Sequence, residues 1–448
     1  MIDMINEVGI GEHIKGFFWL HAAFVRKYFN ILLLSITLGI ACGFTMVLFN
    51  YLLLFFRISF SYLPYFIRPV IAGVLTSFLV KLGNCNHIMG TGAAEFIDDV
   101  NNAESEQFVK AEKNLKRKQN LLAKTFSTSW TYGSGMICGL EGPGLLIGGN
   151  LGYLFSKSDR INLDQMDAFF IGASACTGAI LKAPISGALF CAELPYHNHI
   201  RYKSLIPSIM ASTIAYFIFC LFFVFTPLIQ TDLKLRPDQI NYFLLLPYLV
   251  LFGILTGLFV FLFMGLLRGF INKLKIIFEN KPGFWILPMI GAIGYGVFLY
   301  FTIPFISSDF QFLFIASDSS FFTFFLYFFD KFTISWDFLL ILLILFLIGI
   351  FLSIGTMNSA GIILPLMIFG AIIGGLFGVL FYPKNPELFV LLGITAVSGA
   401  SLNNPITAIF LIIELTWAPF LLIAAGITVI IAYIFSGLSA IVPGQKRV

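Results

Sequence analysis

Glu141 is the residue whose type and position point most directly to chemistry. It lies in the segment CGLEGPG, and no charged residue stands within ten positions on either side. A carboxylate in apolar sequence is costly unless it meets a cavity or a helix terminus, and Pro143 predicts such a terminus because proline favours helix starts. Since a carboxylate there resembles a bound anion, we predict that Glu141 gates an anion site, filling it when ionised and leaving when protonated. The alternative is a structural carboxylate bonded to backbone N–H groups.

Two further motifs predict helix starts within apolar sequence. One is Leu364-Pro365 in GIILP, and the other is Gly90-Thr91-Gly92, which precedes the short helical segment AAEFIDDV. A helix N-terminus carries roughly half a positive charge. Two or three that converge at membrane depth would form a dehydrated anion site without a full cation. The Thr91 hydroxyl suits an N-cap or a donor to the ligand, and ordinary capping is the alternative for each motif alone.

An internal duplication relates the two halves of the chain. At an offset of 222 residues, Gly139, Pro143, Gly148 and Gly152 recur as Gly361, Pro365, Gly370 and Gly374. At an offset of 221 residues, Gly172, Gly178, Pro184 and Glu193 recur as Gly393, Gly399, Pro405 and Glu414. Duplicated halves with interrupted hydrophobic segments are typical of transporters whose substrate site lies at the repeat interface. We predict one domain over 1–448, with pseudo-repeats at roughly 28–227 and 240–442.

Composition places the chain among polytopic membrane proteins. Hydrophobic residues make up 58% and charged residues 11% of its 448 residues, and the mean hydropathy is +0.93. Such a chain cannot offer water an adequate polar surface. Apolar runs near or beyond the ~20 residues needed to span hydrocarbon are Ile31–Phe56, Ile206–Phe225, Tyr242–Leu267, Phe284–Phe305, Phe338–Ile354 and Phe420–Ile441.

Other apolar segments are short or are broken by Gly or Pro. They are 122–140, 142–155, 166–181, 184–195, 362–381, 388–402 and 405–415. Broken backbone at membrane depth is tolerated only where protein buries it or where it lines a cavity. These segments therefore predict a chain built around a buried site.

Charge is sparse, and its placement predicts orientation. Lys15, Arg26 and Lys27 precede the first run, KAEKNLKRK spans 110–118, and Lys446-Arg447 lie near the end, so the positive-inside rule places all three groups in the cytoplasm. For 103–120 we favour a solvated loop or amphipathic helix over a lipid-binding patch. A net charge of +4 is too small and dispersed to suggest nucleic acid. No cleavable signal peptide is visible, because the first ~30 residues contain acids and bases among the apolar residues.

The remaining polar residues give little support to other classes. Five of six cysteines lie in apolar segments, and neither His197 with His199 nor Cys85 with His87 has a second ligand pair for a metal. No Walker A sequence is present, so direct ATP-driven pumping is not expected. An intramembrane enzyme with Glu141 as base is a remote alternative, because no Ser/His, paired-Asp or zinc constellation accompanies it. We therefore expect neither an enzyme nor a cofactor.

Together these motifs resemble the CLC family of chloride channels and proton-coupled chloride transporters. The family motifs G-S-G-I-P, G-[K/R]-E-G-P and G-x-F-x-P are similar to GTGAA (90–94), GLEGP (139–143) and GIILP (361–365), in the same order and spacing. LKAPISGALFCAEL and LNNPITAIFLIIEL resemble the family's two matched helices at its dimer interface. The resemblance covers roughly residues 20–445.

The resemblance implies an all-α fold with an inverted repeat, a homodimer in the lipid bilayer, and one anion pathway per subunit. It implies chloride and protons as the transported species and, since the chain resembles the family's bacterial branch, an integral protein of a bacterial inner membrane. It also implies an anion site made by these residues: Thr91, Gly92, Gly142, Ile362, Ile363 and, in place of the family's pore tyrosine, Val442 or, with a one-residue shift, Ile441.

Several departures from the family pattern keep the mechanism open. Ala94 replaces a proline, Leu140 a basic residue and Ile363 a common phenylalanine, and the inner proton-accepting glutamate of the transporters falls at Leu194. Glu193, one position away, could carry the proton, although its repeat position favours a structural role. Glu141 supports chloride/proton antiport, whereas Leu194 supports the alternative of a passive or uncoupled, voltage- or pH-gated chloride channel.

Overall fold

The computed structural model is almost wholly helical. It describes residues 10–83, 88–104, 112–156, 164–197, 199–229, 241–278, 283–306, 308–315, 322, 325–326, 334–437, 442 and 444–447. The expected all-α fold is confirmed, with one addition: β1 (Tyr196–His197) and β2 (Lys446–Arg447) form a short parallel ladder. Cys85, His87 and Ile441 lie outside the described residues. Of the basic cluster at 110–118, the structure describes the backbone from residue 112 onwards and none of the side chains.

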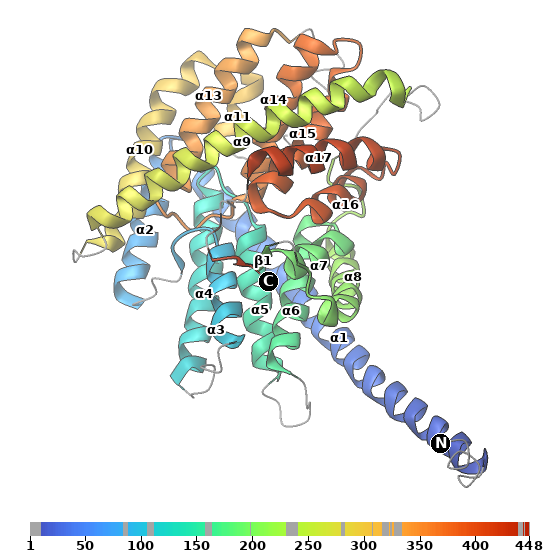
Figure 1. Ribbon diagram of the computed structural model, residues 1–448. Coiled ribbons are helices and arrows are strands. Elements are labelled where there is room, and N and C mark those ends of the chain that lie inside the picture. The colour runs from blue at the N-terminus through green and yellow to red at the C-terminus, as the bar shows by residue number, and fades with distance from the viewer. Residues whose placement is uncertain are drawn as a thin grey trace.

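The two halves of the chain form two groups of helices (Figure 1). The first half contains α1 (Ile10–Ser61), α2 (Ile67–Gly83), α3 (Ala93–Glu104), α4 (Glu112–Gly133), α5 (Glu141–Ser156), α6 (Gln165–Leu181), α7 (Pro184–Glu193) and α8 (Leu205–Phe222). The second contains α9 (Tyr242–Phe278), α10 (Leu287–Thr302), α11 (Ser308–Ile315), α13 (Trp336–Ser353), α14 (Ile363–Phe381), α15 (Pro386–Leu402), α16 (Pro405–Thr416) and α17 (Leu421–Ser436). Short 3-10 turns are η2 (Tyr202–Ser204), η4 (Phe284–Ile286) and η5 (Ile303–Phe305). In Figure 1 most first-half helices lie low and most second-half helices lie high, while α2 packs beside α10.

Six helices of the described chain are long and apolar enough to cross a membrane. Five of them correspond to predicted runs, and the sixth is α14, which the sequence reasoning wrongly placed among the broken segments. Its glycines do not interrupt it because they pack against α15 instead of starting turns. The predicted run Phe420–Ile441 is also too long: α17 ends at Ser436, since Gly437 adopts φ +77°.

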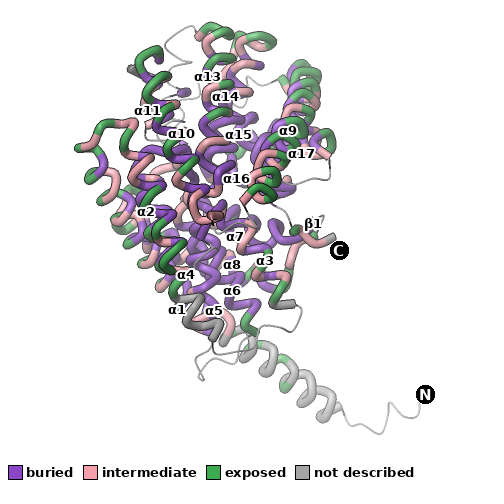
Figure 2. Tube along the Cα trace, turned by 90° about the vertical axis from the view of Figure 1, so that its left-hand side faces the viewer, coloured by how far each residue is buried: buried purple, intermediate pink, exposed green. Residues whose placement is uncertain are grey.

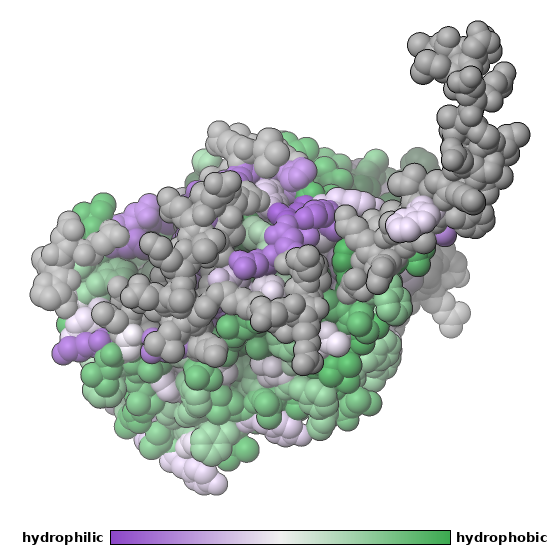
Figure 3. Space-filling model, turned by 90° about the horizontal axis from the view of Figure 1, so that it is seen from below, coloured by the Kyte–Doolittle hydropathy of each residue, from purple (hydrophilic) through white to green (hydrophobic). Residues whose placement is uncertain are grey.

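Burial and hydropathy follow from a membrane environment. The helices at the centre of the molecule are mostly buried, and exposed residues lie mainly on peripheral helices (Figure 2). Seen from below, apolar residues cover one broad side and hydrophilic residues gather towards the other (Figure 3). Apolar side chains that face outwards meet lipid without cost, whereas backbone groups must be paired inside the protein.

Repeat-related glycines set the closest helix packing. A Cβ placed on Gly148 of α5 would lie 2.2 Å from the carbonyl oxygen of Gly172 in α6, and one on Gly370 of α14 would lie 2.1 Å from that of Gly393 in α15. Any larger residue would push these helices apart. The two helix pairs α5/α6 and α14/α15 therefore repeat one packing arrangement, which explains the matched glycine spacing in the sequence.

The repeats also meet directly at their first matched glycines. The N–H of Gly139 donates to the carbonyl of Gly361 at 2.7 Å, and the N–H of Gly361 donates to the carbonyl of Gly139 at 2.8 Å. This antiparallel bridge joins the segments that lead into α5 and α14. It brings the two predicted helix starts to one place at the centre of the molecule.

Candidate anion site

Both predicted helix starts at the repeat interface are confirmed. α5 begins at Glu141 and α14 at Ile363, so Pro143 and Pro365 are each the third helical residue, not the first as expected. The first four N–H groups of a helix have no partner within it, so proline fits here too. Both first turns lie inside the protein, since Gly142, Pro143, Leu364 and Pro365 are buried.

The third predicted start, α3, begins at Ala93 and lies against α5. A Cβ on Gly92 would be 2.6 Å from the backbone carbonyl of Gly142. A Cβ on Gly142 would be 2.0 Å from the backbone carbonyl oxygen of Thr91. Gly90 and Gly92 have φ +90° and +82°, values that glycine adopts most readily. The three N-terminal turns are therefore brought together, as the sequence predicted.

Glu141 lies where these turns meet. Its side chain is buried, at 4% exposure, and its Oε2 accepts the N–H of Leu364 in α14 at 3.4 Å. The same oxygen would lie 2.4 Å from a Cβ on Gly139, so the side chain folds back over that glycine. The carboxylate of one repeat thus occupies the helix N-terminus of the other, where an anion would bind.

The remaining predicted anion-site residues differ in their surroundings. Ile362 and Ile363 are buried at the start of α14, and Val442 is buried in the same apolar core. Thr91 is half-buried, and its hydroxyl makes no hydrogen bond to the described residues. It is not the N-cap of α3, because Gly92 holds that position and its carbonyl accepts the Phe96 N–H at 3.1 Å. The Thr91 hydroxyl therefore remains available to a ligand.

Lys124 of α4 is a residue that the sequence reasoning missed. It is 1% exposed, and its ammonium donates to the carbonyls of Ile88 at 2.9 Å and Gly90 at 2.8 Å. A basic side chain therefore lies beside the Thr91 motif, whereas the sequence predicted a site without a full cation. The sequence did contain a signal that could have identified this residue, because Lys124 is the one charged residue between 119 and 140.

Polar contacts fix the Thr91 segment to the second repeat. Gly90 donates its N–H to Met357 and accepts the N–H of Ala360, at 3.1 and 3.3 Å. The Ser359 hydroxyl accepts from Ser127 at 2.8 Å. These bonds satisfy the irregular backbone that the apolar surroundings would otherwise leave unpaired.

Glu193 and Glu414 cap each other's repeat. Glu193, at the end of α7, accepts from the N–H groups of Ile406 and Thr407 and from the Thr407 hydroxyl, at 3.3, 2.9 and 2.6 Å. Glu414 in α16 accepts from the N–H groups of Ile185 and Ser186, at 2.9 and 2.7 Å. The carboxylates stabilise the N-termini of α16 and α7, a contact that fits the structural alternative.

No metal site is evident in the part of the chain that the structure describes. It contains no group of three or more His, Cys, Asp or Glu residues placed to hold an ion. The described cysteines are free, and four of the five are buried. His197 is buried whereas His199 is exposed, so the two histidines have different surroundings.

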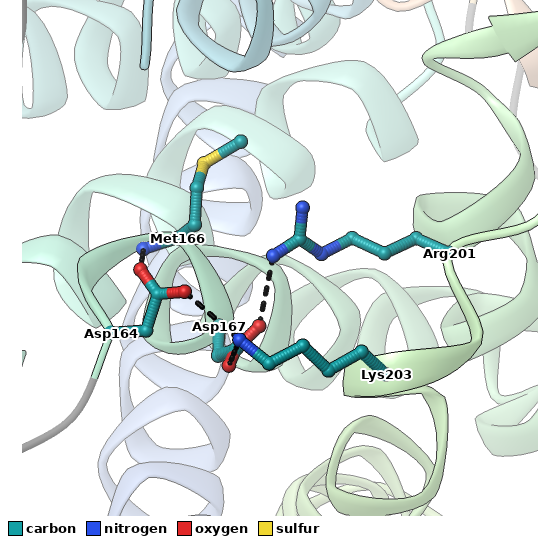
Figure 4. A network of polar contacts seen from close by, with 5 residues as sticks. All are labelled: Asp164, Met166, Asp167, Arg201 and Lys203. Atoms are coloured by element: carbon teal, nitrogen blue, oxygen red, sulfur yellow. Dashed lines mark hydrogen bonds and ion pairs between the residues drawn. The ribbon is translucent and has the colours of Figure 1, made fainter. Parts of the chain in front are cut away.

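A charged network lies where α6 begins (Figure 4). Asp164 caps α6 through the Met166 N–H at 3.1 Å and pairs with Lys203 at 3.0 Å. Asp167 pairs with Lys203 at 2.8 Å and with Arg201 at 2.9 Å. Partial burial acts to raise the pKa of Asp164, but the bonds from Lys203 and Met166 outweigh it and hold that pKa below its ordinary value.

Comparison with known proteins agrees with this architecture. The family model for voltage gated chloride channels matches residues 84–437. A CLC-type fluoride/proton antiporter has a similar structure, with a TM-score of 0.75 and 19% identity over 93% of this chain and 98% of the other. A slow cyanobacterial Cl⁻/H⁺ antiporter gives 0.73 and 17%, over 92% and 96%. A eukaryotic CLC transporter gives 0.69 and 16%, over 92% and 72%.

These structural likenesses show the fold, an inverted repeat of tilted and broken helices, and the family match covers most of the chain. The spanning helices make the protein an integral membrane protein. This chain belongs to the CLC family of voltage-gated chloride channels and related anion transporters.

Proposed function

We propose that this protein exchanges chloride, or a similar small anion, for protons, with Glu141 as the gate. The observation that carries the proposal is the contact between the Glu141 carboxylate and the N–H of Leu364 at the start of α14. A transported anion would need the same donor. Carboxylate and anion therefore compete for one place, and protonation of Glu141 removes the competitor.

The surroundings of this place suit a dehydrated halide. The half-positive ends of α3, α5 and α14 favour negative charge, and so does the side chain of Lys124 when it is protonated. Thr91 offers a hydroxyl donor, Gly92 and Gly142 allow close backbone approach, and Ile362, Ile363 and Val442 form apolar walls. The same features would disfavour cations.

The second candidate is passive or uncoupled chloride conduction. Leu194, which is fully buried, can neither hold nor relay a proton, and both oxygens of Glu193 accept hydrogen bonds from α16. Antiport therefore needs another group to carry protons. Without one, Glu141 would gate a chloride pathway that protons open but do not cross.

A flux assay on reconstituted vesicles separates the two candidates. Chloride and proton movements are recorded together after a pH gradient is imposed across chloride-loaded proteoliposomes. Antiport predicts that the pH gradient drives chloride against its own gradient. If chloride only follows its gradient and no proton flux appears, conduction is the correct function. A parallel assay with fluoride tests which halide is preferred, because one structural neighbour is a fluoride/proton antiporter.

We further propose that the protein acts as a homodimer in a bacterial inner membrane. The apolar residues Ile185 of α7, Phe217 of α8 and Ile406 and Phe410 of α16 are exposed, at 41–55%. These helices lie together, so their side chains form a shared apolar surface that suits a second copy. Mass determination of the detergent-solubilised protein by light scattering tests this; a monomeric mass over a wide concentration range would contradict it.

A further inference from the structure

A buried histidine has a nitrogen for which the structure gives no partner. His197 of β1 is 8% exposed, and its Nε2 makes no hydrogen bond with any described residue. A buried polar atom without a partner carries a free-energy cost of about 1–3 kcal/mol. Most buried polar groups are hydrogen-bonded, so this unpaired nitrogen calls for an explanation.

The position of His197 is fixed from two sides. The N–H of Arg201 donates to the carbonyl of Ala192 at 3.1 Å, which closes the loop that carries His197 onto the end of α7. On the other side, His197 pairs with Arg447 in the β ladder, and the N–H of Lys446 donates to Pro195 at 2.9 Å. His197 is thus held three residues beyond Leu194, in the strand β1 whose label lies beside the C-terminus in Figure 1.

The C-terminal segment 444–447 is hydrogen-bonded to several helices or to the residues that follow them. The Gln445 amide donates to the carbonyls of Leu194 and Leu402 at 2.8 and 2.9 Å, and its oxygen accepts from Asn403 at 3.0 Å. Gly444 accepts from Asn101 of α3 at 2.9 Å. The segment therefore joins α3, α7 and α15, and His197 lies next to it through the β ladder.

The acidic groups nearby are already engaged. Glu193 bonds the start of α16, and Asp167 pairs with Arg201 and Lys203. Asp98 of α3 lies beside Gly444 and also takes part in polar contacts. The other charged groups on the adjoining elements, Lys446 and Arg447 of β2, are cations. Among these side chains, His197 combines burial with an open hydrogen-bonding position and a ring with two nitrogens that can each hold a proton.

We infer that His197 is the group through which protons enter from the side of the C-terminal segment and pass towards Glu141. The inference rests on the proposed proton coupling and names a residue for it. An imidazole can accept a proton on one nitrogen and release one from the other, so it relays protons without a net change. His197 is thus the proton carrier at a place where Leu194 cannot hold a proton and both oxygens of Glu193 already accept hydrogen bonds.

The test compares proton and chloride fluxes in vesicles that contain wild-type protein, His197→Gln or His199→Gln. The exposed His199 two positions away is the matched control. We expect His197→Gln to lower the ratio of proton to chloride flux at least about tenfold, and His199→Gln to leave it at the wild-type value. Adding Leu194→Glu to His197→Gln should restore proton flux, because a carboxylate then stands next to the lost relay.

The outcomes separate this inference from the proposed function. If wild-type protein moves no protons, coupling itself is wrong, and the inference fails with it. If wild-type protein is coupled and His197→Gln keeps the full ratio, only the relay is wrong. A fall in both fluxes together, without rescue by Leu194→Glu, would assign His197 to folding and would also overturn the relay.

Discussion

Glu193 accepts two backbone N–H groups from α16, while its repeat partner Glu414 accepts two from α7. We expect Glu193→Ala to destabilise the protein, because it leaves two buried N–H groups and the Thr407 hydroxyl without a partner, at about 1–3 kcal/mol for each group. Thermal unfolding in detergent should show a lower midpoint, and Glu414→Ala should do the same to a smaller extent at its half-buried position. An unchanged midpoint together with lost proton flux would instead make Glu193 a proton carrier.

Glu141→Gln should abolish proton-coupled flux while chloride flux continues. Glutamine has nearly the shape of the protonated acid, so it models the side chain that no longer competes for the Leu364 N–H. Fluxes in proteoliposomes measure both quantities, and Asp164→Asn, in the charged network at α6, is a control for loss of a carboxylate elsewhere. Proton coupling that survives in Glu141→Gln would remove the gate.

Thr91→Val should weaken chloride binding by about 1–3 kcal/mol. Valine keeps the volume but removes the hydroxyl that lacks a partner among the described residues. Calorimetric titration with chloride measures the effect, and Thr45→Val in α1, whose hydroxyl bonds its own helix, controls for the substitution itself. Equal affinity in the wild type and Thr91→Val would show that the hydroxyl does not contact the anion.

Lys124→Met and Lys124→Gln together separate charge from hydrogen bonding. Both remove the cation beside Gly90, so both should weaken anion binding, by at least about 1 kcal/mol for a buried charge. Glutamine retains a donor for the carbonyls of Ile88 and Gly90, so we expect it to unfold at a higher temperature than methionine. If chloride affinity is unchanged in both variants, Lys124 only positions the Thr91 segment.

The low pKa of Asp164 predicts a pH-dependent contribution to stability. Because the pKa in the folded protein lies below the value of about 3.9 in unfolded chains, this contribution is full above pH ~4 and is lost as the pH falls through the folded value. Asp164→Asn keeps a good N-cap but removes the charge. The difference in the free energy of unfolding between wild type and Asp164→Asn should therefore be small, within about 1 kcal/mol for an exposed pair. It should vanish on acidification. A difference that does not shrink as the pH falls below about 4 would contradict this assignment.

The predicted helix starts at Pro143 and Pro365 correspond to real elements because proline and glycine act locally, and the duplicated spacing identified their common interface. The roles of Lys124 and His197 could not be predicted in this way. Lys124 is paired with carbonyls 34 and 36 residues away, and His197 with a strand at the other end of the chain. Such partners are set by the way helices pack, which no local spacing records. The length of α14 was misjudged for the same reason, since its glycines meet another helix.

The reciprocal bonds between Gly139 and Gly361 limit how this protein can move. Separating the two segments would leave four backbone groups unpaired in apolar surroundings, each at a cost of about 1–3 kcal/mol. Neither glycine has a side chain that could replace a lost hydrogen bond. The two segments are therefore held together as one unit at the centre of the molecule, and we expect motions near the site to come from rotations of side chains and displacements of outer segments.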